Sequence, residues 1–119
     1  MTSGYSDWSP ALNSGDNWHI RIQWNRSNVN TTAQTCTINA RVCLAYYTSS
    51  MRQKSTSISI GGAKTASAST SIPAHSDYTH PSSIVESQYS GWVAFNDVPI
   101  DNSGNSIGAI NSNNNRITI

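Results

Sequence analysis

The stretch NWHIRIQWN, residues 17–25, alternates apolar and polar side chains without interruption. The apolar side chains share one face of an extended chain: Trp18, Ile20, Ile22 and Trp24. The polar ones share the other face: His19, Arg21 and Gln23. A period of two predicts a strand with one buried face and one wet face. Because both tryptophans lie on the isoleucine face, we expect them in the core and not on a ligand platform.

A second long strand is predicted over TCTINARVCLAYY, residues 35–47, after the turn-forming sequence RSNVNTTAQ. Its apolar face would carry Cys36, Ile38, Ala40, Val42, Leu44 and Tyr46. Its other face would carry Thr35, Thr37, Asn39, Arg41, Cys43, Ala45 and Tyr47. The two cysteines have opposite parity and, on one strand, would lie more than ~20 Å apart. A disulfide needs Cα atoms within about 7 Å, so we predict free thiols. Cys36 would point inward, and Cys43 outward or against a second layer.

The sequence pattern of the rest of the chain also predicts short strands separated by turns. Residues 55–72 predict a hairpin around Gly61–Gly62, with Ser/Thr-rich arms at an edge or half exposed. A loop follows over 73–83, then one strand or two over 83–98, with a bend at Ser90–Gly91. DNSGNS, residues 101–106, marks a turn, and NRITI closes the chain.

Seven or eight short strands without helical periodicity predict an all-β fold, an antiparallel β-sandwich of immunoglobulin-like or jelly-roll type. We expect residues 1–12 to form an N-terminal arm and residues 13–119 a single domain.

Composition narrows the function classes. Ser, Thr and Asn number 21, 11 and 13, whereas charged residues are only 11% of the chain. Seven Lys/Arg balance six Asp/Glu, so a phosphate-binding basic stripe is not expected, and neither is nucleic acid as a partner. The opening MTSGYSDWSP has no signal-peptide pattern, and no apolar run is long enough to insert into a membrane. We therefore expect synthesis in a cytoplasm without Sec export.

The aromatic residues off the apolar faces are the candidate ligand contacts. Trp92 has the opposite parity from Val93 and Phe95 and shares its face with small polar residues, as a sugar-stacking platform would. The alternative is that Trp92 fills a subunit interface or covers a sheet edge. The full candidate carbohydrate-binding set is Trp92, Tyr89, Tyr47, Tyr78 and Asn96. Tyr5 and Trp8, in the N-terminal arm, are the candidate subunit contacts.

Metal and catalytic motifs are weak. His75, Asp77 and His80 in HSDYTH match no standard zinc spacing, and an Asp-containing turn is favoured there. DNSGNS lacks the glycine and glutamate positions of an EF-hand. Glu86 is the sole glutamate, and no GxSxG setting occurs. We therefore predict no metal, no cofactor and no enzymatic activity.

Several segments together resemble one known group of proteins. The W-x-I-x-I-x-W strand is followed by NRSNVNTTAQ, TCTINARVCLAYY, the SISIGGAKTASASTSI hairpin and the IPAHSDYTH loop. This order is similar to β-sandwich modules in tail-tip and tail-fibre proteins of siphophages that infect Gram-positive bacteria. Pro73, His75 and Asp77 correspond to the family's VPHNADGSK-like loop, although Tyr78 replaces a glycine there.

The resemblance spans about Asn17 to Trp92 and implies a virion structural protein that contacts host cell-wall polysaccharide. We expect a symmetric homo-oligomer in contact with other virion proteins. Two alternatives stay open: a purely structural subunit, such as a capsid decoration protein or a filament subunit, and a carbohydrate-binding module of a secreted enzyme.

Overall fold

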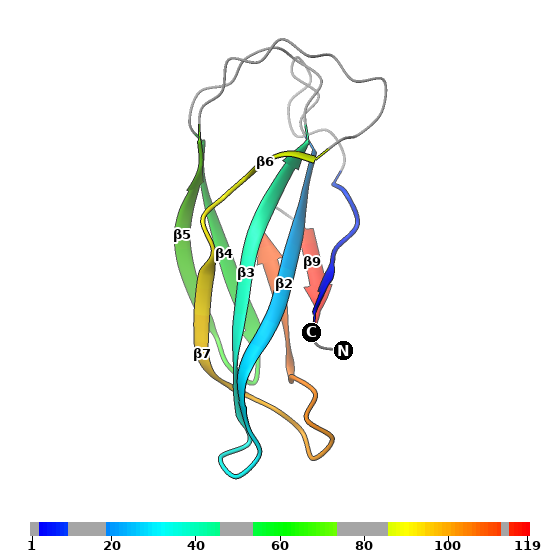
Figure 1. Ribbon diagram of the computed structural model, residues 1–119, viewed down its shortest axis with the longest axis vertical. Helices are drawn as coiled ribbons and strands as arrows, with labels where there is room; N and C mark the ends of the chain where they lie inside the picture. The colour runs from blue at the N-terminus through cyan, green and yellow to red at the C-terminus, as the bar shows by residue number, and fades with distance from the viewer. Residues whose placement is uncertain (1–2, 10–18, 46–53, 74–85, 113–114) are drawn as a thin grey trace.

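The computed structural model describes residues 3–9, 19–45, 54–73, 86–112 and 115–119. Within these ranges the chain forms nine strands in two antiparallel sheets that pack as a sandwich (Figure 1). Three of the strands are only three or four residues long. The expected antiparallel β-sandwich is confirmed.

The first sheet is built on the two long strands that the alternating sequences predicted. β2 (His19–Asn30) pairs with β3 (Thr35–Ala45), and β1 (Ser3–Tyr5) pairs with the outer edge of β2. The other edge of β3 takes two strands in succession, β6 (Glu86–Tyr89) and β7 (Val93–Pro99). The bend expected at Ser90–Gly91 separates these two strands.

The second sheet has the order β5-β4-β8-β9 and lies behind the first in Figure 1. Its strands are β4 (Lys54–Gly62), β5 (Ala66–Ile72), β8 (Gly108–Ser112) and β9 (Asn115–Thr118). β5 is an edge strand that alternates exposed and half-buried residues along most of its length, as its Ser/Thr content predicted. β4 is an internal strand of the sheet.

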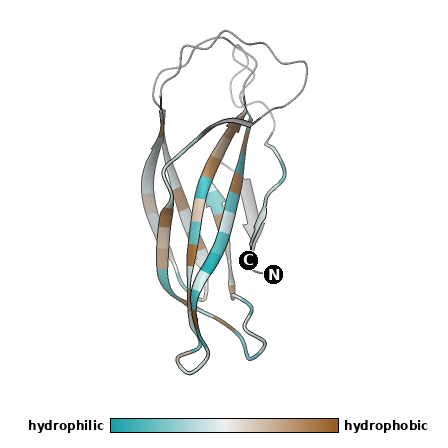
Figure 2. Ribbon diagram, in the orientation of Figure 1, coloured by the Kyte–Doolittle hydropathy of each residue, from teal (hydrophilic) through white to brown (hydrophobic). Residues whose placement is uncertain are grey.

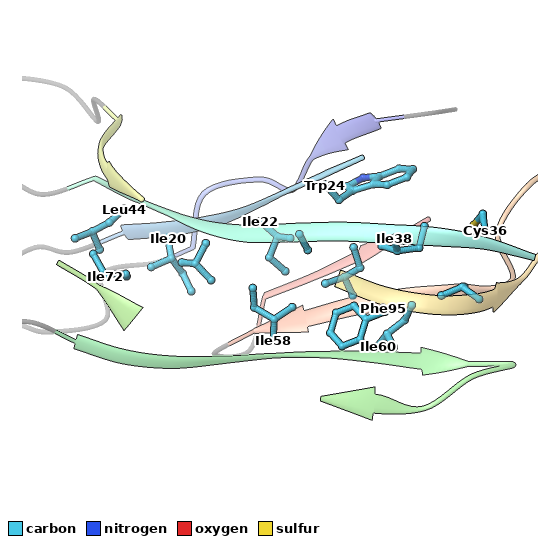
Figure 3. Packing of buried hydrophobic residues seen from close by; sticks show 14 of the residues in the cluster. Ile20, Ile22, Trp24, Cys36, Ile38, Leu44, Ile58, Ile60, Ile72 and Phe95 are labelled. Atoms are coloured by element: carbon cyan, nitrogen blue, oxygen red, sulfur yellow. The ribbon is translucent and has the colours of Figure 1, made fainter. Parts of the chain in front are cut away.

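The core lies between the sheets and contains the apolar faces of β2 and β3 (Figure 3). Trp24 is 1% exposed and Ile22 and Ile38 are fully buried, as the period of two predicted. The second sheet contributes Ile58, Ile60, Ile72 and Ile110. The alternation of apolar and polar residues is visible as bands along β2 and β3 in Figure 2. Trp18 lies outside the described residues.

The turn between β2 and β3 is shorter than the sequence predicted. RSNVNTTAQ was expected to be all turn, but β2 continues through Asn30 and leaves only residues 31–34 as the turn. The strand tolerates these residues because its pairing with β3 shifts register between Ser27 and Asn30. Asn28 adopts a positive φ of 51° there, a conformation that asparagine accepts more readily than most residues.

The β4–β5 hairpin forms, but Gly61 and Gly62 are not its turn. Both belong to β4 and pair with Ala109 and Gly108 of β8, so residues 63–65 make the turn. Of the two, Gly62 is required, because it allows the backbones of β4 and β8 to approach each other closely. A Cβ on Gly62 would lie 2.6 Å from the Cα of Gly108, and the φ of Gly62 is +108°. No residue with a side chain fits this site without displacing backbone.

The N-terminal segment and the cysteines complete the fold. Residues 3–9, which belong to the predicted N-terminal arm, lie along β2 of their own chain. As predicted, Cys36 and Cys43 are thiols and do not form a disulfide. Both are buried: Cys36 belongs to the core, and Cys43, for which an outward position or contact with a second layer was predicted, is 0% exposed. In the ranges that the structure describes, no helix is long and apolar enough to cross a membrane.

Candidate functional site

The outer face of the first sheet carries a square of four side chains at the centre of the β2–β3 pair. Arg21 lies opposite Cys43, and Gln23 lies opposite Arg41. The Nε of Arg41 donates a hydrogen bond to Oε1 of Gln23 at 2.8 Å. This square places two guanidinium groups on adjacent strands, on the face that is turned away from the core.

Nearly the same tetrapeptide flanks this square on both sides. YSDW, residues 5–8, lies along β2, and YSGW, residues 89–92, lies along β3. Tyr5 pairs with Gln23, and Tyr89 pairs with Cys43. The two tetrapeptides are far apart in the sequence, and the sheet brings them to opposite edges of one hairpin.

The serine of each tetrapeptide makes the same two hydrogen bonds. The amide of Ser6 donates to Ile22 O at 2.9 Å, and its hydroxyl accepts from the Ile22 amide at 2.8 Å. The amide of Ser90 donates to Val42 O at 2.9 Å, and its hydroxyl accepts from the Val42 amide at 2.8 Å. Since Ile22 and Val42 are themselves paired, the arrangement has an approximate two-fold axis between them.

A bulge beside each serine turns both aromatic rings to one side. Ser6 bonds Ile22 and Ser9 bonds Ile20, so three residues of the N-terminal segment span two of β2. On the other side, Ser90 bonds Val42 and Val93 pairs with Ala40, again three residues against two. In a regular strand, a tyrosine and a tryptophan three residues apart would point to opposite faces. The extra residue restores them to the same face.

Each tyrosine–tryptophan pair stacks on one arginine. The guanidinium carbon of Arg21 lies 4.2 Å from the ring centroid of Tyr5 and 4.6 Å from that of Trp8. We call these three residues the first cluster. The second cluster is Tyr89, Trp92 and Arg41, with distances of 4.0 and 4.7 Å from the Arg41 carbon to the two rings. Each contact of this kind contributes about 0.5–1 kcal/mol at an exposed site.

The rings remain accessible although they stack on arginine. Tyr5 is 50% exposed, Trp92 is 46% exposed and Tyr89 is 37% exposed, whereas Trp8 is half-buried. Large apolar surfaces that are exposed together on one face are characteristic of interaction sites. The predicted outward orientation of Trp92 is what the structure shows.

Amide and hydroxyl side chains extend the same face toward the β2–β3 turn. The amide of Asn39 donates to Asn25 Oδ1 at 2.9 Å and to Ser27 Oγ at 3.1 Å. The hydroxyl of Thr37 donates to Oδ1 of Asn96 at 3.1 Å. Asn96 is exposed and lies on β7 beyond the second cluster. The face therefore combines exposed rings with neutral hydrogen-bonding groups.

The sequence-predicted site residues fall into three groups. Trp92, Tyr89 and Asn96 lie on this one face, whereas Tyr47 and Tyr78 are outside the described residues. Tyr5 and Trp8, the candidate subunit contacts, form the first cluster on the same face. Sequence reasoning missed the role of Arg21 and Arg41. The repeated Tyr–Ser–x–Trp sequence was the signal that could have found them.

The described side chains include no group of three His, Cys, Asp or Glu residues that could hold a metal ion. His75, Asp77 and His80 lie outside those ranges. Oδ1 of Asp101 accepts hydrogen bonds from the amides of Ser103 and Asn105, each at 2.9 Å. These bonds, that from Asn105 above all, lower the pKa of Asp101. DNSGNS is thus a turn, as predicted, and the structure shows that its own aspartate holds it.

Comparison with known proteins found no match to this chain among family models, curated sequences or solved structures. We therefore infer the function from the geometry of the outer face.

Proposed function

We propose that this protein is a non-enzymatic virion component, part of a phage tail, that binds a glycan of the host cell surface. Its binding site would be the outer face of the first sheet. The resemblance to tail-tip and tail-fibre modules supports the virion assignment, as does a surface rich in hydroxyl and amide groups and poor in charge.

One observation carries the binding assignment: Trp92 and Tyr89 are 46% and 37% exposed and stack on the same arginine. A ring in this setting is held in place before a ligand arrives, so little conformational entropy is lost on binding. Aromatic rings can cover the apolar face of a sugar while polar groups bond its hydroxyls. Asn96 offers such a polar group on the same strand edge as Trp92.

The shape of the face favours an extended ligand. The aromatic and amide side chains lie side by side across the strands of one sheet. Adjacent strands are about 4.8 Å apart, so the two clusters span roughly 14 Å from β1 to β6. A glycan chain of several units would lie across this distance.

The test is retention of the protein on purified cell walls and on a glycan array. We expect the wild type to be retained and Trp92→Ala to be lost. Ile107→Ala is the matched control, since Ile107 is also 46% exposed but belongs to neither cluster. Equal retention of the wild type and Trp92→Ala would contradict the assignment of the face.

Assembly into a homo-oligomer is the second part of the proposal, with Tyr5 and Trp8 as the candidate subunit contacts. Tyr5 is 50% exposed and belongs to the edge strand β1. We expect the wild type to sediment as an oligomer and Tyr5→Ala to shift toward the monomer. Immunogold labelling of purified particles tests the virion location, and a label confined to the capsid would contradict the tail assignment.

A further inference from the structure

The two clusters share their geometry, but the tetrapeptides that supply their rings differ at one position. Asp7 lies between Tyr5 and Trp8, whereas Gly91 lies between Tyr89 and Trp92. A Cβ at position 91 would lie 3.0 Å from the Oγ1 of Thr70, which belongs to the second sheet, so this hydroxyl would have to move by a few tenths of an ångström to admit a side chain. The first cluster therefore has a carboxylate within its bulge, and the second has no side chain there.

Arg41 of the second cluster has hydrogen-bond donors to offer a ligand. In the part of the chain that the structure describes, Arg41 makes a single hydrogen bond, from its Nε to Gln23. The four N–H groups on its two Nη atoms are the donors that remain. Arg41 is half-buried, and its guanidinium lies beside two rings. Arg41 is thus a fixed cation with donors to spare, at the side of two exposed aromatic rings.

We propose that the second cluster binds an anionic sugar unit, with Arg41 as the anion-binding group. This inference rests on the proposed glycan-binding function and names the chemical class of the glycan. Tyr89 and Trp92 stack on the sugar, and the Nη groups of Arg41 bond its carboxylate or phosphate oxygens. Arginine suits this role because its planar fork matches both anions with two parallel hydrogen bonds.

The environment of Arg41 strengthens such a contact. The hydrogen bond to Gln23 and the two ring contacts fix the side chain, so it loses little rotamer freedom when an anion binds. Gln23 is itself held, because its Nε2 donates to the hydroxyl of Tyr5 at 3.0 Å. The first cluster thereby helps to orient the cation of the second.

The experiment compares glycans that differ only in charge. Binding of the 119-residue chain is measured on polygalacturonate and on its methyl ester, and on a phosphomannan before and after removal of phosphate. We expect the charged form to bind about tenfold more tightly than its uncharged partner. The two arms tell a carboxylate from a phosphate ligand. Rising salt should weaken binding of the charged form and leave that of the uncharged form nearly unchanged.

Arg41→Gln should remove the preference for the charged form, whereas Arg21→Gln, the matched change in the first cluster, should keep it. Circular dichroism checks that both variants fold, and if Arg41→Gln does not, the salt dependence of the wild type decides. Equal binding of charged and uncharged forms by the wild type would overturn this inference and leave the glycan proposal standing. Equal loss of the preference in both variants would overturn the assignment to Arg41. Failure to bind any glycan would overturn both proposals.

Discussion

Ile22 and Val42 lie opposite each other in the β2–β3 pair, and each exchanges the same two hydrogen bonds with a buried serine. In both places the serine hydroxyl accepts the amide hydrogen that a carbonyl of a regular neighbouring strand would accept. The serine hydroxyl thus supplies the hydrogen-bond acceptor that the strand amide would lack where the bulge removes a backbone partner. The orientation of the aromatic rings on the outer face depends on these serine hydrogen bonds, because the bulge beside each serine sets the direction of the rings.

Replacement of Ser90 by alanine should destabilise the fold. The Val42 amide would lose its acceptor, and an unsatisfied buried donor costs about 1–3 kcal/mol. Urea unfolding measures the change in free energy. Ser67→Ala, on the exposed side of β5, is the control and should change stability by less than about 0.5 kcal/mol. Equal stability of Ser90→Ala and wild type would show that the hydroxyl is dispensable.

The adjacent glycines of β4 should differ sharply in their tolerance of alanine. Gly62→Ala brings a Cβ within 2.6 Å of Gly108 and forces strain at a positive φ, so we expect a loss of about 1–3 kcal/mol or more. Gly61→Ala meets nothing within 4 Å and should stay close to wild type. Thermal unfolding of the two variants provides the comparison, and similar melting temperatures would contradict the close-approach explanation.

Trp24 and Trp92, which lie on opposite faces of the first sheet, should separate stability from binding. Trp24→Ala empties a buried site and should cost about 3–5 kcal/mol. Trp92→Ala removes one arginine contact at the surface and should cost no more than about 1 kcal/mol. Denaturant titration tests both values. A large loss of stability in Trp92→Ala would make that residue a structural one.

The turn at Asp101 should make a pH-dependent contribution. Hydrogen bonds lower the folded-state pKa of Asp101 below its ordinary value of 3.8, so the ionised form is the stabilising one. Asp101→Ala should therefore be less stable than wild type at neutral pH. The difference is present above pH 3.8 and should shrink as the pH falls through the folded-state pKa. Melting temperatures across this range, with Ser103→Ala as control, check the trend; a constant difference would contradict it.

The period of two was enough to predict which faces of β2 and β3 are buried. Ile20, Ile22 and Trp24 are buried as their parity required, since a strand with one wet face leaves no other arrangement. The same rule could not predict the clusters. A bulge changes the parity of every residue after it, and nothing in the local pattern at Trp8 marks one. Only comparison of residues 5–8 with residues 89–92 shows that both segments share one conformation.

The glycines show a second limit. Gly61–Gly62 has the composition of a two-residue turn, and by local chemistry alone it was predicted as one. The need for glycine at position 62 comes instead from Gly108, on a strand that is distant in the sequence. Tertiary approaches of this kind have no local signature.

Ser6 and Ser90 make the same hydrogen bonds to the β2–β3 pair, but these bonds close chain loops of unequal length. Ser6 lies 16 residues from its partner Ile22, and Ser90 lies 48 residues from Val42. Loop-closure entropy grows with the logarithm of length, so the longer connection costs about 1 kcal/mol more to close. We therefore expect the N-terminal side to join the hairpin first during folding. The side that carries Tyr89 and Trp92 would join last, and in the native state it would be the first to open to hydrogen exchange.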